Sequence, residues 1–231
     1  MRSYLNLLND GVITMSKKAF PIDKVFQRLD PVIAKMDAPV VDFLATQVDD
    51  PYKILIATIL SARTTDQITT KVVQKLFPKA SDMEELSKYS VEEIEELIYP
   101  VGFYRQKAKQ LKKLPEVLKE KFNGQIPDEI DDLVQLPGVG RKTANLVRAV
   151  AFKKPAICVD VHVHRITNRW GYIKTKTPLE TEMKLRDILP LEYWLKINSY
   201  LVTLGQKICR PVRPRCEECP INDLCQKVAV K

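Results

Sequence analysis

Four cysteines near the C-terminus constrain the folding of this 231-residue chain more than any other feature. Cys209, Cys216, Cys219 and Cys225 follow the pattern C-x6-C-x2-C-x5-C. So tight a group has the spacing of a single metal centre, and such quartets bind either zinc or an iron–sulfur cluster. Structural zinc sites usually contain two C-x2-C pairs, whereas this pattern contains one.

The chain carries no sign of export or membrane insertion. No stretch approaches the roughly 18 consecutive apolar residues that a membrane span requires. Residues 1–18 lack the apolar core and small-residue cleavage site of a secretory signal. We therefore expect an intracellular protein, cytoplasmic or nucleoid-associated in a prokaryote, without membrane contact. In that environment clustered cysteines more often bind metal than form disulfides.

Charge and periodicity suggest a helical protein with a polyanionic partner. Lys and Arg outnumber Asp and Glu by 37 to 29, which gives a net charge of +8 and a pI near 9.1. A basic surplus of this size suits nucleic acid, although many basic proteins do not bind it. Strand-like alternation is almost absent, and we predict an all-α protein of about ten short helices. Their expected ranges are Ile22–Met36, Pro51–Ala62, Asp66–Phe77, Val91–Ile98, Gln106–Phe122, Asp128–Gln135, Arg141–Phe152, Val161–Trp170, Leu179–Ile188 and Leu191–Lys207.

Two glycines separate a pair of these helices. Gly138 and Gly140 are expected to adopt backbone conformations closed to other residues and to keep side chains out of the turn. The amides of such a turn, with the N-terminus of the next helix, can hold a phosphate. An ordinary helix–helix turn is the alternative, and the glycine spacing alone favours it.

A lysine and an aspartate close to this turn are candidates for chemistry. Lys142 follows Arg141 and lies at a predicted helix N-terminus. The charge of Arg141 and the positive end of the helix dipole both disfavour the ammonium form of Lys142, and only the neutral amine can attack carbon. Asp160 follows an apolar run and could stabilise developing positive charge or accept a proton. The alternatives are a phosphate contact for Lys142 and a helix cap for Asp160, and capping can coexist with catalysis.

The string LPGVGRKTAN at residues 136–145 resembles the helix-hairpin-helix DNA glycosylase superfamily, most closely its endonuclease III branch. The resemblance runs from about Pro21 to Cys225 and includes the segments 60–62, 102–104 and 159–162. It implies a two-domain all-α fold and a 4Fe–4S cluster bound by the cysteine quartet. The expected division is an N-terminal extension (1–20), a central domain with the helix-hairpin-helix (40–152), and a cluster domain built from 21–39 and 153–231.

The resemblance also implies a reaction. In bifunctional members the lysine at the position of Lys142 displaces the damaged base at C1′, forms a Schiff base and breaks the strand by β-elimination on the 3′ side. Asp160 matches the family's aspartate motif and is the second expected catalytic residue. We predict a base-excision repair enzyme, a DNA N-glycosylase and AP lyase that acts as a monomer on duplex DNA containing oxidised pyrimidines, such as thymine glycol, or abasic sites.

Further residues are expected to contact DNA. The resemblance makes Phe103 a wedge that enters the duplex, although a core phenylalanine is an equal alternative from sequence. Arg63 stands where the closest relatives usually carry glutamine, which bears on the choice of opposite base. Phosphate contacts are expected from Gly138, Gly140, Arg141 and Arg213.

Three other functions fit parts of this pattern. A monofunctional mismatch glycosylase would share the fold, but relatives of that kind generally lack the lysine. A non-catalytic iron–sulfur DNA-binding protein would keep the scaffold without needing both Lys142 and Asp160. A zinc-stabilised helical binding module would be colourless.

Overall fold

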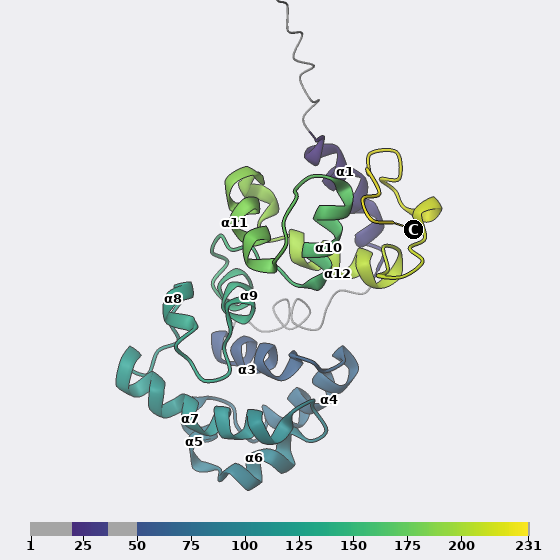
Figure 1. Cartoon of the computed structure of the whole chain (residues 1–231). Coiled ribbons are helices and arrows are strands. Elements are labelled where there is room, and N and C mark those ends of the chain that lie inside the picture. Colours follow the sequence, from purple (N-terminus) through teal and green to yellow (C-terminus); the bar gives the residue numbers. More distant parts are fainter. Residues whose placement is uncertain (1–19, 37–49, 231) are drawn as a thin grey trace, which may run out of the picture.

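The computed structural model describes residues 20–36 and 50–230, and within these ranges the chain forms helices, turns and loops without any strand. Of the expected N-terminal extension (1–20), only Phe20 lies within the described residues. The helices form two groups with α9 between them (Figure 1). Across the described ranges, no helix is both long and apolar enough to cross a membrane.

The first group of helices packs around α3, whose residues from Ile54 to Leu60 are all buried. Asp50 caps its first turn by accepting from the amides of Tyr52 and Lys53. Helix α3 packs against α9, α4 and α7, and α7 covers α5 and α6. The helices of this group are α3 (Pro51–Ser61), α4 (Asp66–Leu76), α5 (Met83–Lys88), α6 (Val91–Ile98), α7 (Tyr104–Phe122), α8 (Ile130–Leu133) and α9 (Arg141–Ala151).

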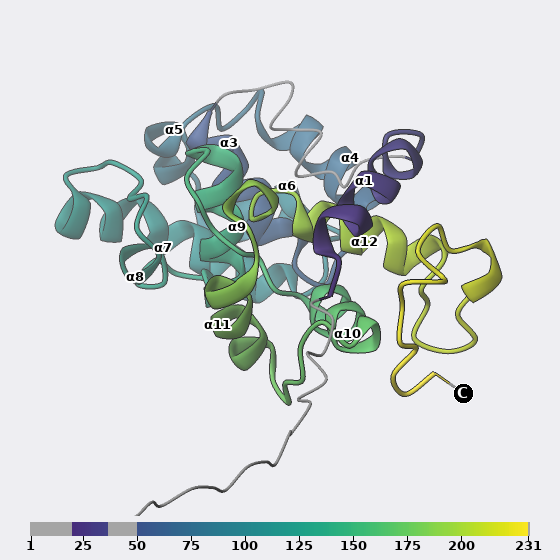
Figure 2. The same ribbon diagram turned by 90° about the horizontal axis from the view of Figure 1, so that it is seen from above.

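The second group joins the first described helix to the C-terminal part of the chain. Helices α1 and α12 pack together (Figure 2), and Phe26, Trp170 and Leu201 are nearly fully buried in their shared core. Its helices are α1 (Ile22–Ile33), α10 (Val161–Trp170), α11 (Pro178–Ile188) and α12 (Ile197–Lys207), with short 3-10 turns at Leu191–Tyr193 and Cys216–Glu218.

The two groups have separate apolar cores. The core around α3 extends to Ala156, and the core around α10 begins at Ile157. We propose that each core is the centre of one of the two expected domains. The change of core at Ala156 is close to the expected boundary after residue 152.

Two details of the predicted helices are wrong. The helix expected over Leu191–Lys207 is broken into the 3-10 turn and α12, where the indole N–H of Trp194 donates to the carbonyl of Leu189. Helix α5 was not expected, because its six residues bury a single side chain, Leu86, and so give no periodic signal.

Candidate active site and metal centre

Lys142 and Asp160 face each other across the starts of two helices. Lys142 lies in the first turn of α9, and its Nζ is 3.9 Å from Oδ2 of Asp160. The other carboxylate oxygen, Oδ1, accepts from the backbone amides of His162 (2.8 Å) and Val163 (2.9 Å). Asp160 therefore caps α10 with one oxygen and presents the other to the amine. The Lys142 side chain is 57% exposed and that of Asp160 only 9%, so the amine is open to a ligand while the carboxylate is sheltered.

The two histidines after Asp160 have different partners. Nδ1 of His162 lies 3.1 Å from Nη2 of Arg165, whereas Nδ1 of His164 lies 2.7 Å from the hydroxyl of Thr181. Burial lowers the pKa of His162 below its ordinary value, and the nearby carboxylate of Asp160 opposes that shift. The His162 ring is therefore neutral at pH 7 and accepts from Arg165.

Arg141 forms a bidentate pair with a buried carboxylate. Its Nε and Nη2 donate to Glu182 at 3.0 and 2.9 Å, and Glu182 is only 4% exposed. Arg186, in the same helix as Glu182, donates to this carboxylate as well. The Arg141–Glu182 pair links α9 to α11. Glu182 thus offsets only part of the positive charge expected to act on Lys142 from Arg141, because it is shared with Arg186. A DNA contact by Arg141 stays a prediction, and nothing in the sequence near Arg141 pointed to Glu182.

The two hairpin glycines differ in what they require. Gly138 has a φ of +81°, and a Cβ there would lie 2.9 Å from Oε1 of Gln110. Gly140 has a φ of −90°, and no atom lies within 4 Å of its Cβ position. The expectation of a glycine-only conformation at Gly140 is therefore wrong, because any residue adopts that φ. The hairpin depends on Gly138 alone for its backbone shape.

These two glycines provide a matched pair of substitutions. We expect Gly138→Ala to lower the free energy of unfolding by about 1–2 kcal/mol, because a side chain is forced into the left-handed region. Gly140→Ser should change it by only a few tenths of a kcal/mol, because Gly140 is the N-cap of α9 and serine and glycine are both favoured there. Urea unfolding measures both values. Equal effects at the two positions would contradict this account of the hairpin.

Arg63 and Phe103 form a stacked pair at the surface. The guanidinium carbon of Arg63 lies 5.5 Å from the centroid of the Phe103 ring. Both residues have positive φ, 55° and 59°, and Phe103 is 59% exposed. The alternative of a core phenylalanine is thus wrong. An exposed aromatic ring beside a cation is the kind of side chain that can replace a lost base in a stack.

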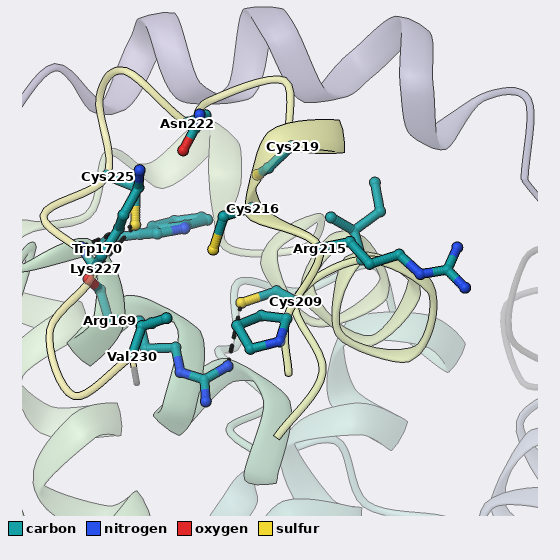
Figure 3. Close-up of a pocket in the computed structure, with 12 residues that line it drawn as sticks. Arg169, Trp170, Cys209, Arg215, Cys216, Cys219, Asn222, Cys225, Lys227 and Val230 are labelled. Atoms are coloured by element: carbon teal, nitrogen blue, oxygen red, sulfur yellow. Dashed lines mark hydrogen bonds between the residues drawn. The ribbon is translucent and has the colours of Figure 1, made fainter. Parts of the chain in front are cut away.

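The four cysteines line one cavity at the end of the second helix group. Figure 3 shows Trp170 beside them and the guanidinium of Arg169 donating to Sγ of Cys209 at 3.6 Å. Arg169 is 8% exposed and also donates to the carbonyls of Arg210 and Pro211, so it holds the start of the cluster loop (residues 209–225). This role could not be read from the sequence, because a basic residue on a helix is usually solvated.

All four cysteines share this cavity, and in the described part of the chain no three Cys, His, Asp or Glu side chains are grouped closely enough to bind one metal ion. Burial raises the pKa of Cys219 to about 11, with the neighbouring cysteines adding to the shift. A bound cationic group is therefore needed to keep this sulfur as the thiolate that binds metal.

The arginines of the cluster loop point to its outer surface. Arg210, Arg213 and Arg215 are exposed, and Arg213 has a φ of 49°. Arg215 pairs with Glu218 at 3.5 Å. The expected phosphate contact by Arg213 stays a prediction. Cys158, the fifth cysteine, is 2% exposed in the core, as expected of a small apolar side chain.

The family model described as "HhH-GPD superfamily base excision DNA repair protein" matches residues 56–191, more than half of the chain. The chain belongs to the HhH-GPD superfamily. A second model, the iron–sulfur binding domain of endonuclease III, matches residues 209–225. Endonuclease III of Thermotoga maritima is 48% identical over 177 residues, which are 77% of this chain and 83% of that protein.

Solved structures of endonuclease III also resemble this HhH-GPD protein. One is a non-covalent endonuclease III–DNA complex, with a TM-score of 0.75 and 37% identity over 89% of this chain and 95% of that one. Another is a trapped endonuclease III–DNA covalent intermediate, with a TM-score of 0.75 and 34% identity over 89% and 94%. Together these findings confirm the expected fold, the DNA glycosylase and AP lyase class, and the 4Fe–4S cluster.

The assignment of the cluster ligands can be tested by substitution, with Cys158, the fifth cysteine, as a control. We expect Cys219→Ser to remove the visible absorbance of the cluster and to lower iron content from about four atoms per chain to a small fraction of that. Thermal stability should fall with it, because metal binding supplies much of the order of such a loop. Cys158→Ser, which changes a cysteine outside the cavity, should keep the iron. Full iron content in Cys219→Ser would exclude this cysteine as a ligand.

Proposed function

We propose that this HhH-GPD enzyme removes oxidised pyrimidines, such as thymine glycol, from duplex DNA and then cleaves the strand, with Lys142 as nucleophile. The observation that carries the proposal is the Lys142–Asp160 pair, an exposed amine 3.9 Å from a sheltered carboxylate oxygen. An amine needs a nearby proton acceptor before it can attack carbon. Oδ2 is the oxygen of Asp160 that capping leaves free for this purpose.

In the proposed reaction, Nζ of Lys142 passes a proton to Asp160 and attacks C1′ of the damaged nucleotide. The C1′–N bond breaks, and the base leaves with the bonding electrons and takes up a proton. The nitrogen lone pair then opens the sugar ring by breaking the C1′–O4′ bond, and O4′ takes up a proton. The Schiff base formed in this way makes the C2′ protons acidic. Loss of one of them then expels the 3′ phosphate by β-elimination. The negative charge of Asp160 also stabilises the positive charge that develops on the sugar. Electrostatic stabilisation of this kind contributes a large share of many enzymes' rate enhancements.

Other parts of the molecule would hold the substrate. The hairpin around Gly138 and the start of α9 offer backbone amides to a phosphate, and Arg213 offers a charge from the cluster loop. Arg63 and Phe103 would fill the space that the extruded nucleotide leaves. The cluster, when bound, fixes the loop that carries Arg213 and takes no part in the chemical steps. We propose a monomer that acts inside the cell.

Borohydride trapping on duplex DNA with a single abasic site tests this function. We expect the wild-type protein to form a covalent adduct and, without borohydride, a nick on the 3′ side. A monofunctional mismatch glycosylase would give neither adduct nor nick on this DNA, although it would release a base from duplex DNA that contains a mismatch. A binding protein without catalysis would shift the DNA on a gel and give neither product, which would refute the proposal.

A further inference from the structure

A buried lysine near the Arg63–Phe103 pair has no part in the proposed chemistry. Lys107 lies in the first turn of α7 and is only 6% exposed. From the sequence, the basic stretch Lys107–Lys113 suggests either a grip on the DNA backbone or a solvated face, and neither describes the side chain of Lys107. Its Nζ donates to the carbonyls of Leu60 (2.8 Å) and Ala62 (2.7 Å), and it lies 3.4 Å from the hydroxyl of Thr64.

The acceptors of Lys107 lie at the C-terminus of α3. The last carbonyls of a helix lack partners within it and carry partial negative charge. The ammonium of Lys107 supplies these missing partners from another helix.

In the part of the chain that the structure describes, no carboxylate lies within ion-pair distance of the Lys107 ammonium. Burial accordingly lowers the pKa of Lys107 to about 8. A buried charge without a counter-ion is costly, so its hydrogen bonds must offset that cost.

The same contacts connect the two segments that carry the stacked pair. The amide of Gly102 donates to the hydroxyl of Thr64 at 3.0 Å, and the amide of Lys107 donates to the carbonyl of Phe103 at 3.0 Å. A Cβ at Gly102 would lie 2.3 Å from the carbonyl oxygen of Arg63, so the two backbones are in direct contact. Thr64 and Lys107 therefore join the end of α3 to the start of α7.

The pair held by this junction is under backbone strain. Arg63 and Phe103 both occupy the left-handed region, which is strained for a residue other than glycine. Such conformations persist only where surrounding contacts enforce them. The cavity beside the pair is lined by residues of α3, α7 and the hairpin, including Gln110 and Gly138. The junction thus fixes the pair next to the hairpin.

We propose that Lys107 is a positioning residue, which holds Arg63 and Phe103 in the pose that enters the duplex. The inference rests on the proposed role of this pair in filling the space left by an extruded nucleotide. Lys107 lines the cavity beside the pair, but it is only 6% exposed and its ammonium is held by protein oxygens, so we assign it no direct contact with DNA. Its effect on DNA therefore passes through Arg63 and Phe103.

The test uses duplex DNA with a tetrahydrofuran abasic analogue opposite 2-aminopurine, whose fluorescence reports stacking of the orphan base. At saturating protein, wild type should change the fluorescence, whereas Lys107→Met should lose most of that change. Affinity should fall about tenfold, as for the loss of hydrogen bonds to a charged group. Lys109→Met removes a charge from an exposed position on the same helix and should keep the full fluorescence change. A wild-type response in Lys107→Met, or no response in wild type, would overturn the inference.

Two further variants separate positioning from general stability. Thr64→Val keeps Lys107 and removes only the shared hydroxyl, so it should show the same fluorescence loss even if Lys107→Met fails to fold; a wild-type response would contradict the inference. In the Lys107→Met/Arg63→Ala double variant, the loss of affinity should equal that of the larger single variant. Additive losses would mean that Lys107 acts independently of the pair. Because these readouts measure binding, a wild-type protein that fails borohydride trapping would refute the proposed reaction without deciding the role of Lys107.

Discussion

Replacing Lys142 with alanine is expected to abolish the covalent adduct with abasic DNA and to lower strand cleavage by more than about 10³-fold. The amine is the group that would form the Schiff base, and Asp160, its sheltered neighbour, has no nitrogen with which to replace it. Folding should be unaffected, because the Lys142 side chain is 57% exposed. Trapping with borohydride and single-turnover cleavage measure both activities on the same substrate.

Lys142→Arg is the matched control for this prediction. Arginine keeps the positive charge and can contact a phosphate, but it does not form a Schiff base. If Lys142 is a nucleophile, Lys142→Arg should bind DNA like wild type and still give no adduct. If Lys142 only contacts a phosphate, the arginine variant should retain most activity, and the search for the nucleophile would have to begin again.

Asp160→Asn should have the second-largest effect, a fall of about 10²–10⁴-fold in the single-turnover rate with little change in stability. An asparagine oxygen can still accept from the amides of His162 and Val163, so the cap of α10 is retained. What is lost is the negative charge that faces Lys142. The variant isolates that charge from the structural role of the side chain.

Asp160→Ala tests the structural role of the side chain as the cap of α10. Alanine removes the cap as well as the charge, so we expect an additional loss of about 0.5–2 kcal/mol in the free energy of unfolding. Urea unfolding compares the two variants directly. Equal destabilisation by asparagine and alanine would contradict the capping account, whereas wild-type activity of Asp160→Asn would leave Asp160 without a catalytic function.

Most helices and the chemical residues were readable from the sequence. The periodic spacing of apolar residues marks α3, α6 and α10 because each buries one face or more against a core. The string around Lys142 and the cysteine spacing could be recognised because each is a local pattern whose function depends on short distances along the chain. Helix α5 was missed because six residues are too few to establish a period.

The partners of these residues could not be read, because they depend on which distant segments the fold brings together. Glu182, 41 positions from Arg141, pairs with that arginine, and Arg169 holds a cysteine 40 positions away. Lys107 looked like one more solvated cation on a basic helix, yet it is buried against carbonyls 45 and 47 positions before it. Burial changes the contribution of a charge to the free energy of folding. A solvated lysine contributes little, whereas a buried ammonium is destabilising unless it donates hydrogen bonds to protein oxygens. The sequence by itself indicated the helical class through local spacing, and its resemblance to the glycosylase superfamily pointed to the candidate nucleophile and the candidate metal ligands. Only the tertiary structure decided which charges are paired, sheltered or free to meet DNA, because that depends on packing between elements far apart in the chain.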